Sequence, residues 1–290
     1  MFLSGCGTAL ITPFKNGEVD CLAYGELIDR QVEAGVKFLV PLATTGETPC
    51  LEDNEKLELL ETAKEHAKGL PLLVGCGTNS LKHTLRNIKL LDSHGADAYL
   101  VVVPFYNKPT QEGQYEYFKA IAESVDKPIV IYNVPGRTGA NMTAETALRL
   151  AEIDNIIGTK EASGNYAQIS AIIRNAPEGF SVLSGNDDET LSIIATGGHG
   201  VISVASNIAP APVAEMTEAA LAGDFARARV LHHRLTPLFK NCFVESNPIP
   251  VKAGMAAMGL IQNELRLPLV KSSDATYTLM EQTVRDLGLL

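Results

Sequence analysis

The sequence predicts an α/β fold in which eight parallel strands close into a (β/α)8 barrel of the TIM type, followed by a C-terminal helical extension. Short runs rich in Val, Ile and Leu alternate with segments of helical periodicity, eight times in succession. Each strand–helix unit spans roughly 25 to 30 residues, a length typical of a closed parallel barrel. The turn after the first expected strand also lacks the Gly-x-Gly-x-x-Gly signature that an open nucleotide-binding sheet usually carries.

The expected elements follow in chain order. Strands are predicted at residues 7–12, 38–41, 72–75, 98–103, 129–134, 156–160, 181–184 and 200–203. Helices are predicted between and after them at 22–33, 52–68, 81–94, 111–124, 144–151, 166–175, 187–196 and 211–222. Gly35, Gly95 and Gly198 each stand shortly before a strand, where a left-handed residue can end a helix. Thr143 is expected to cap the helix at 144–151.

The pattern changes after Gly223, where strand-like runs stop. Helices are expected at 224–239, 250–258 and 273–287. The chain therefore divides into a barrel over residues 1–223 and a C-terminal helical domain over residues 224–290. Such an appendage can cover the barrel or join subunits, and both arrangements remain open at this point.

Composition excludes several classes of protein. With 290 residues, 46% of them hydrophobic, the chain can bury a large core, and its net charge of −10 argues against a general binder of nucleic acids or anionic membranes. No apolar run approaches the ~20 residues that cross a bilayer. The five cysteines form no CxxC pair, which favours reduced thiols in a cytoplasmic protein. The six histidines form neither HxH nor HExxH, so no metal site is predicted.

Lys160 ends the predicted strand at 156–160 and is the first candidate for chemistry. An amine at the mouth of an apolar strand loses solvation, which favours the neutral form that can condense with a ketone to a Schiff base. Taken alone, Lys160 is more often a solvated strand end. The residues at the other strand ends decide between these interpretations.

Barrel enzymes place their reactive groups where strands end and loops begin. A phenol can exchange protons during imine formation, and a guanidinium can bind a carboxylate with two parallel hydrogen bonds. Each such residue also has a structural explanation: a helix-capping turn, a core position or a surface site. Their occurrence on successive strand ends favours a shared site. These candidates are Thr44, Thr45, Tyr106, Tyr132, Arg137 and Gly185.

Seven motifs give the chain a resemblance to a known family over nearly its whole length. They are Gly7 to Phe14, Thr44 to Glu47, Pro104 to Pro109, Tyr132 to Gly139, Gly158 to Ala162, Gly197 to Ser203 and Asn247 to Lys252. In these motifs the chain resembles the dihydrodipicolinate synthase family. That family belongs to the pyruvate-dependent class I lyases of the N-acetylneuraminate lyase superfamily.

The resemblance implies condensation of pyruvate with L-aspartate 4-semialdehyde to 4-hydroxy-tetrahydrodipicolinate, a step of lysine and diaminopimelate biosynthesis. It implies no organic cofactor or metal, and a cytoplasmic homotetramer built from two tight dimers. The implied catalytic residues are Lys160, which forms the imine, and Tyr132, which relays protons with Thr44 and with Tyr106 from a partner subunit. The implied substrate-binding residues are Arg137 for the semialdehyde carboxylate, Thr45 for the pyruvate carboxylate, Gly185 and Ile202 in the pocket wall, and Asn247.

Some positions depart from the family pattern. Where lysine-inhibited members bind the effector, this chain has Asp53, Lys56, His83 and Phe105 in place of the usual groups, so weak or absent inhibition by lysine is expected. Two alternative functions stay open. Another pyruvate lyase, acting on N-acetylneuraminate or a 2-keto-3-deoxy sugar acid, would keep Lys160 and Tyr132 but has less use for Arg137. A non-catalytic barrel would leave the combination of Thr44, Tyr132 and Lys160 unexplained.

Overall fold

The computed structural model describes all 290 residues. Eight parallel strands form one sheet in the order β4-β1-β10-β9-β8-β7-β6-β5. A bridge from Leu39 to Leu72 joins the two outermost strands of this order and closes the barrel, which confirms the predicted fold. The strands are β1 (Gly5–Ala9), β4 (Phe38–Val40), β5 (Leu73–Gly75), β6 (Ala98–Val102), β7 (Ile129–Asn133), β8 (Ile156–Glu161), β9 (Ser181–Ser184) and β10 (Gly200–Ser203).

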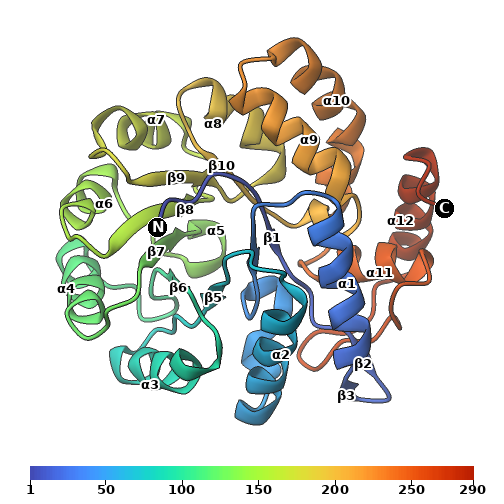
Figure 1. Cartoon of the computed structure of the whole chain (residues 1–290), viewed down its shortest axis with the longest axis horizontal. Coiled ribbons are helices and arrows are strands. Elements are labelled where there is room, and N and C mark those ends of the chain that lie inside the picture. Colours follow the sequence, from blue (N-terminus) through green and yellow to red (C-terminus); the bar gives the residue numbers. More distant parts are fainter.

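Helices surround the strands as an outer ring (Figure 1). Each predicted helix is present, although the one expected at 81–94 becomes α3 followed by a 3-10 turn at Asp92–His94. The ring consists of α1 (Cys21–Glu33), α2 (Asp53–His66), α3 (Leu81–Leu91), α4 (Gln111–Ala122), α6 (Ala144–Ala151), α7 (Tyr166–Asn175), α8 (Thr190–Ala195) and α9 (Pro210–Leu221).

Several local features differ from the sequence prediction. The first strand ends at Ala9 rather than at residue 12, and the helix expected at 187–196 begins with a 3-10 turn before α8. A small antiparallel hairpin, β2 (Phe14–Lys15) with β3 (Glu18–Val19), follows the first barrel strand. A single helical turn, α5 (Pro135–Thr138), forms where only a loop was expected. The left-handed residue after α8 is Gly197, with φ of 102°, rather than Gly198. Gly198 is needed for another reason, because a Cβ there would lie 2.4 Å from Cγ2 of Ile193.

The barrel interior is filled by side chains from alternate strand positions, as expected for a small closed barrel. Val40, Leu100, Val130, Leu183 and Ile202 belong to this interior cluster. The larger apolar cluster lies between the strands and the helices and extends into the C-terminal helices. The interior cluster reaches the carboxyl ends of the strands, while the outer cluster fixes the helices around them.

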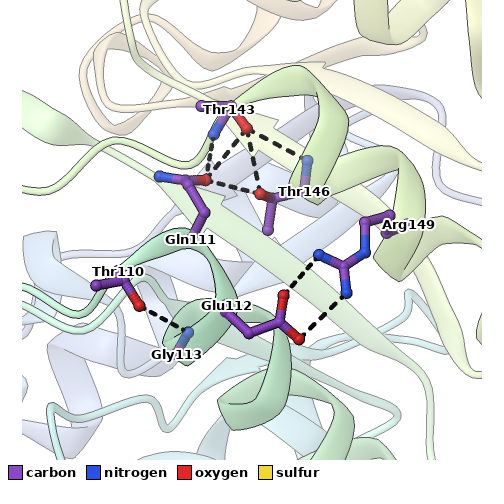
Figure 2. Close-up of polar contacts among 7 residues, drawn as sticks. All are labelled: Thr110, Gln111, Glu112, Gly113, Thr143, Thr146 and Arg149. Atoms are coloured by element: carbon purple, nitrogen blue, oxygen red, sulfur yellow. Dashed lines mark hydrogen bonds and ion pairs between the residues drawn. The ribbon is translucent and has the colours of Figure 1, made fainter.

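Polar contacts join two neighbouring helices of the ring, α4 and α6 (Figure 2). The side-chain oxygen of Gln111 accepts hydrogen bonds from the backbone N–H of Thr143, the hydroxyl of Thr143 and the hydroxyl of Thr146, at 3.0, 3.1 and 2.7 Å. Thr143 also caps α6, as predicted, by accepting from the N–H of Thr146. Glu112 and Arg149 form an ion pair between the same two helices. These contacts fix the segment that connects α5 to α6.

The three helices predicted after residue 223 are present as α10 (Phe225–Asn241), α11 (Ile249–Ala257) and α12 (Asp274–Asp286). α10 packs on α9, and α12 packs on α11 at the periphery of the molecule (Figure 1). None of the helices has both the length and the apolar character needed to cross a membrane.

A buried ion pair attaches the C-terminal segment to the barrel. The Lys252 amine lies 2.7 Å from a carboxylate oxygen of Glu47, and neither side chain is exposed. The same amine donates to the carbonyl oxygen of Thr12 at 2.9 Å and lies 4.3 Å from the ring centroid of Phe14. Burial lowers the pKa of Lys252, and the carboxylate of Glu47 opposes that change. Each charge therefore depends on the other for compensation in a dry interior.

Arg266 extends this network from the irregular segment between α11 and α12. Its backbone N–H donates to Glu47 at 3.1 Å, and its guanidinium binds both carboxylate oxygens of Glu55 at 2.6 and 2.7 Å. The guanidinium also stacks 4.5 Å from the centroid of Phe14. The Arg266 hydrogen bonds lower the pKa of Glu55. The sequence did not predict these contacts, because they join residues about 200 positions apart.

Removing one partner of the buried pair of Glu47 and Lys252 should lower the stability of the fold. We expect Lys252→Met to lower the free energy of unfolding by about 3–5 kcal/mol, because Glu47 is left buried without a counter-charge. The double variant Glu47→Gln/Lys252→Met should recover most of this loss. Urea denaturation of the purified proteins measures both. Arg285→Met, which breaks an exposed pair with Glu281, serves as the control. Equal losses in Lys252→Met and Arg285→Met would contradict the prediction.

Candidate active site

Lys160 and Tyr132 face each other at the carboxyl ends of two adjacent strands. They are partners in the register of β8 with β7. The Lys160 amine lies 4.1 Å from the centroid of the Tyr132 ring. Lys160 is 4% exposed, and Tyr132 is 7% exposed. The interpretation of Lys160 as a solvated strand end is therefore wrong. The amine has no carboxylate partner, so it is available to a ligand.

Tyr132 lines a cavity of about 460 Å³ together with Thr44 and Arg137. The three residues come from β7, from the turn after β4 and from α5, which follows β7. The structure therefore brings a phenol, a hydroxyl and a guanidinium to one opening, as the sequence predicted. No hydrogen bond joins Thr44 to Tyr132 in this structure. Lys160 lies next to this cavity, against the ring of Tyr132.

Thr45 differs from its neighbour Thr44 in burial and in contacts. Both stand in the 3-10 turn Thr44–Gly46, which ends at Glu47 in a left-handed conformation with φ of 52°. Thr44 is exposed, whereas Thr45 is 2% exposed. The hydroxyl of Thr45 accepts a hydrogen bond from the side-chain amide of Asn247 at 2.9 Å. Its own proton remains free to donate, as binding of a carboxylate requires.

Arg137 lies at the rim of the cavity, where the α5 turn positions it and Asn247 of the C-terminal segment contacts it. The one-turn helix α5 ends at Gly139, which has φ of 69°. The Thr138 hydroxyl binds the carbonyl oxygens of Val134 and Ala140 and stabilises this turn. The guanidinium makes one long hydrogen bond, of 3.4 Å, to the carbonyl oxygen of Asn247. Most of its donors therefore remain available for an anionic ligand.

Asn247 connects these two groups from the C-terminal segment. Its side-chain N–H binds Thr45, and its carbonyl oxygen accepts from Arg137. Its side-chain oxygen is buried and has no partner. A buried acceptor without a donor is costly, and a ligand that carries an N–H or O–H would satisfy it. The sequence placed Asn247 in the site only through the family motif, and the structure brings it there physically.

Gly185 directly follows β9 and is partly buried, and Ile202 lies within β10. The N–H of Gly185 donates to the carbonyl oxygen of Glu161 at 2.6 Å, and a Cβ at this glycine would lie 2.7 Å from Cβ of Ala162. Ile202 is completely buried in the interior cluster that also contains Tyr132. Neither residue lines the cavity with Thr44 and Arg137. They shape the packing at the strand ends around Lys160.

Tyr106 does not enter the site of its own chain. Its side chain is 86% exposed, and its backbone has φ of 68°, a left-handed conformation that is uncommon for a residue with a side chain. Its N–H donates to the carbonyl oxygen of Thr138 at 3.4 Å, which ties the Tyr106 loop to α5. A contribution from a partner subunit, as expected from the sequence, stays a prediction.

Glu161 is a titratable group that sequence reasoning passed over. It follows Lys160 in β8 and is 1% exposed. Burial raises its pKa to about 7, and hydrogen bonds from Ser163 and Asn133 oppose the rise. The signal in the sequence was strand alternation, which places the residue after an inward-facing lysine on the outer face of the sheet.

The chain is similar to known proteins over almost its whole length. The model of the Dihydrodipicolinate synthetase family matches residues 2–287. The 4-hydroxy-tetrahydrodipicolinate synthase of Thermotoga neapolitana is 47% identical over 99% of both chains. The crystal structure of dihydrodipicolinate synthase from Thermotoga maritima matches with a TM-score of 0.98 and 46% identity over the full length of both chains.

A third relative carries a ligand. The chloride-inhibited dihydrodipicolinate synthase from Acinetobacter baumannii, solved in complex with pyruvate, matches with a TM-score of 0.96 and 38% identity over 99% of both chains. These similarities extend over essentially the whole chain, barrel and C-terminal helices alike. The chain belongs to the dihydrodipicolinate synthetase family.

Proposed function

We propose that this chain is a lyase that condenses pyruvate with L-aspartate 4-semialdehyde through an imine on Lys160, giving 4-hydroxy-tetrahydrodipicolinate for lysine and diaminopimelate biosynthesis. The observation that carries the proposal is the buried Lys160 amine, 4.1 Å from the Tyr132 ring and without a carboxylate partner. The names of the relatives and their similarity along the whole chain support the same activity.

In the first step, the amine of Lys160 attacks the keto carbon of pyruvate. The resulting carbinolamine loses water and leaves an imine, and both stages need a group that donates and accepts protons. The ring of Tyr132 contacts the Lys160 amine, and Thr44 lines the same cavity as Tyr132. We assign proton transfer to Tyr132 and Thr44, extended by Tyr106 from a neighbouring subunit.

The two carboxylates of the substrates require different partners. Thr45 is suited to the pyruvate carboxylate, because its hydroxyl accepts from Asn247 and can donate to a ligand. We assign Gly185 and Ile202 to the pocket wall near Lys160 on the basis of the family motifs alone. Arg137 is suited to the carboxylate of the semialdehyde, because its guanidinium is only lightly engaged at the cavity rim.

The remaining steps follow from this arrangement. Loss of a proton from the pyruvate methyl group turns the imine into an enamine, whose carbon attacks the aldehyde. The amino group of the semialdehyde then displaces Lys160 and closes the ring. The buried acceptor oxygen of Asn247 can receive a donor of the bound substrate. A sugar-acid partner would use Arg137 less fully than this short amino acid does.

Assembly and location complete the proposal. We propose a homotetramer made from two tight dimers, supported by the projection of Tyr106 away from its own site. We propose a cytoplasmic location, supported by five unpaired cysteines. We retain the division into a barrel of residues 1–223 and a helical domain of residues 224–290, although their apolar side chains share one cluster.

Imine formation tests the activity directly. Borohydride reduction in the presence of pyruvate should add a three-carbon adduct at Lys160 alone, as mass spectrometry of the peptides would show. Lys160→Met should abolish the adduct. A coupled assay with a panel of aldehydes should show the highest kcat/KM for L-aspartate 4-semialdehyde. An adduct on another lysine, or a preference for a sugar aldehyde, would reject the proposed function.

Tyr132 should matter for turnover more than for binding. We expect Tyr132→Phe to lower kcat by roughly 10²–10⁴, the range of general acid–base groups, with a smaller change in KM for pyruvate. The ring, and with it the contact to Lys160, is retained in this variant. Steady-state kinetics measure the effect, and a loss in kcat below about twofold would remove Tyr132 from the mechanism.

Inhibition by lysine should be weak or absent. Lys56 lines the cavity and would repel the ammonium groups of the effector, while Asp53 is already paired with Lys56 and Arg86. Phe105 offers no hydroxyl, and His83 is exposed. Steady-state assays with millimolar lysine, compared with the same concentration of alanine, measure the response. Strong inhibition by lysine alone would contradict this expectation.

A further inference from the structure

The outer face of β7 and β8 carries a second pair of polar residues behind the reactive pair. Tyr132 pairs with Lys160 in the register, and the next positions, Asn133 and Glu161, pair with each other. Successive strand residues point to opposite faces, so the first pair faces the barrel interior and the second faces the helices. Asn133 is completely buried and Glu161 is 1% exposed. The side-chain N–H of Asn133 donates to Glu161 at 2.8 Å.

Asn133 continues this contact to the segment after α5. Its side-chain N–H also donates to the side-chain oxygen of Asn141 and the carbonyl oxygen of Met142, at 3.0 and 3.2 Å. Its side-chain oxygen accepts from the N–H of Met142 at 3.0 Å. Residues 133 and 141 therefore clamp the two ends of the loop that carries Arg137. Because Asn133 also donates to Glu161, these contacts connect the loop to the residue next to Lys160.

The other carboxylate oxygen of Glu161 fixes the chain beyond β8. The hydroxyl of Ser163 donates to it at 2.6 Å, and the N–H of Asn165 donates to the Ser163 oxygen. Asn165 caps α7. The carboxyl group thus lies at the junction of β7, the loop after α5 and the loop before α7. It controls where the end of β8, and hence Lys160, lies relative to these elements.

The charge of this group has no local compensation. Its direct partners are neutral amides and a hydroxyl, and no Lys or Arg forms an ion pair with it. Lys160 precedes it in the strand and points to the opposite face. The charged neighbour that acts on it is Glu189, which adds to the effect of burial in raising the pKa. A glutamine would make similar contacts without the penalty of a buried charge. An ionisable group retained at such a cost is typical of functional sites.

We propose that Glu161 is a positioning residue of the reaction: by binding Asn133 and Ser163, its carboxylate holds Lys160 against Tyr132 and fixes the Arg137 loop. The inference deepens the proposed function and rests on it. The ionised form accepts charge-assisted hydrogen bonds from both partners, which are stronger than neutral ones. The protonated form turns one acceptor into a donor and loosens the junction. Turnover therefore follows the ionisation of Glu161.

Glu161→Gln tests this proposal, because it keeps the shape and the contacts but cannot ionise. In the parent protein kcat should fall as the pH decreases through about 7. Glu161→Gln should lack this change and remain at the low-pH level of the parent. Borohydride trapping of pyruvate at Lys160 should stay complete, and KM for pyruvate should change less than kcat. Glu161→Ala, which removes both contacts, should lose up to roughly 100-fold in kcat, as expected of a misplaced reactive group.

Two controls separate positioning from general disturbance. Glu178→Gln removes an exposed carboxylate in the loop before β9 and should reproduce the parent pH profile. Glu189→Gln removes the charge that raises the pKa of Glu161 and should move the acidic change of kcat to lower pH. An unaltered pH profile in Glu161→Gln would overturn the proposal, even if Glu161→Ala does not fold. Absence of trapping in the parent protein would instead reject the proposed function, and this inference with it.

Discussion

The buried ion pair between Glu47 and Lys252 is the constraint on which the site depends. Glu47 directly follows the turn of Thr44 and Thr45, and Lys252 lies in the first half of α11, which begins just after Asn247. Neither charge is exposed, so neither is stable in the interior without the other. The pair thus brings together the two segments that meet in the hydrogen bond between Thr45 and Asn247. The site is assembled across the barrel and its extension, not within the barrel alone.

Because successive strand residues point to opposite faces of the sheet, the carboxyl ends of β7 and β8 carry two different pairs of polar residues, one on each face. One face directs Lys160 and Tyr132 toward the barrel interior, and the other buries Asn133 and Glu161 under the helices. The inner pair must remain accessible to a ligand, while the outer pair is shielded and fully hydrogen-bonded. Lys160 is supported by the next residues of the two paired strands, Asn133 and Glu161, whose side chains lie on the opposite face of the sheet. The same network reaches the loop that carries Arg137, so the positions of Lys160 and Arg137 are connected through shared hydrogen bonds.

The sequence predicted what is local, and it failed where distant residues meet. Hydrophobic periodicity gave the eight strand–helix units, and strand ends gave Lys160, Tyr132, Thr44 and Arg137, which the structure gathers at one opening. The α5 turn was missed because four residues are too few to show a period. The link from Glu47 to Lys252 was missed because one sequence carries no signal of which buried charges pair. The inclusion of Ile202 and Asn247, and the contribution of Tyr106 from a partner subunit, rested on family resemblance alone.

The position of Asn247 near the end of the chain has a consequence for synthesis of the protein in the cell. The barrel strands are complete at Ser203, so a nascent chain can begin to close its sheet before the last helices leave the ribosome. The hydrogen bonds of Asn247 with Thr45 and Arg137, and the ion pair of Lys252 with Glu47, form only after these C-terminal residues have emerged. A polypeptide interrupted during translation in α10 would therefore contain every strand and Lys160, yet lack the contacts that Asn247 makes with Thr45 and Arg137.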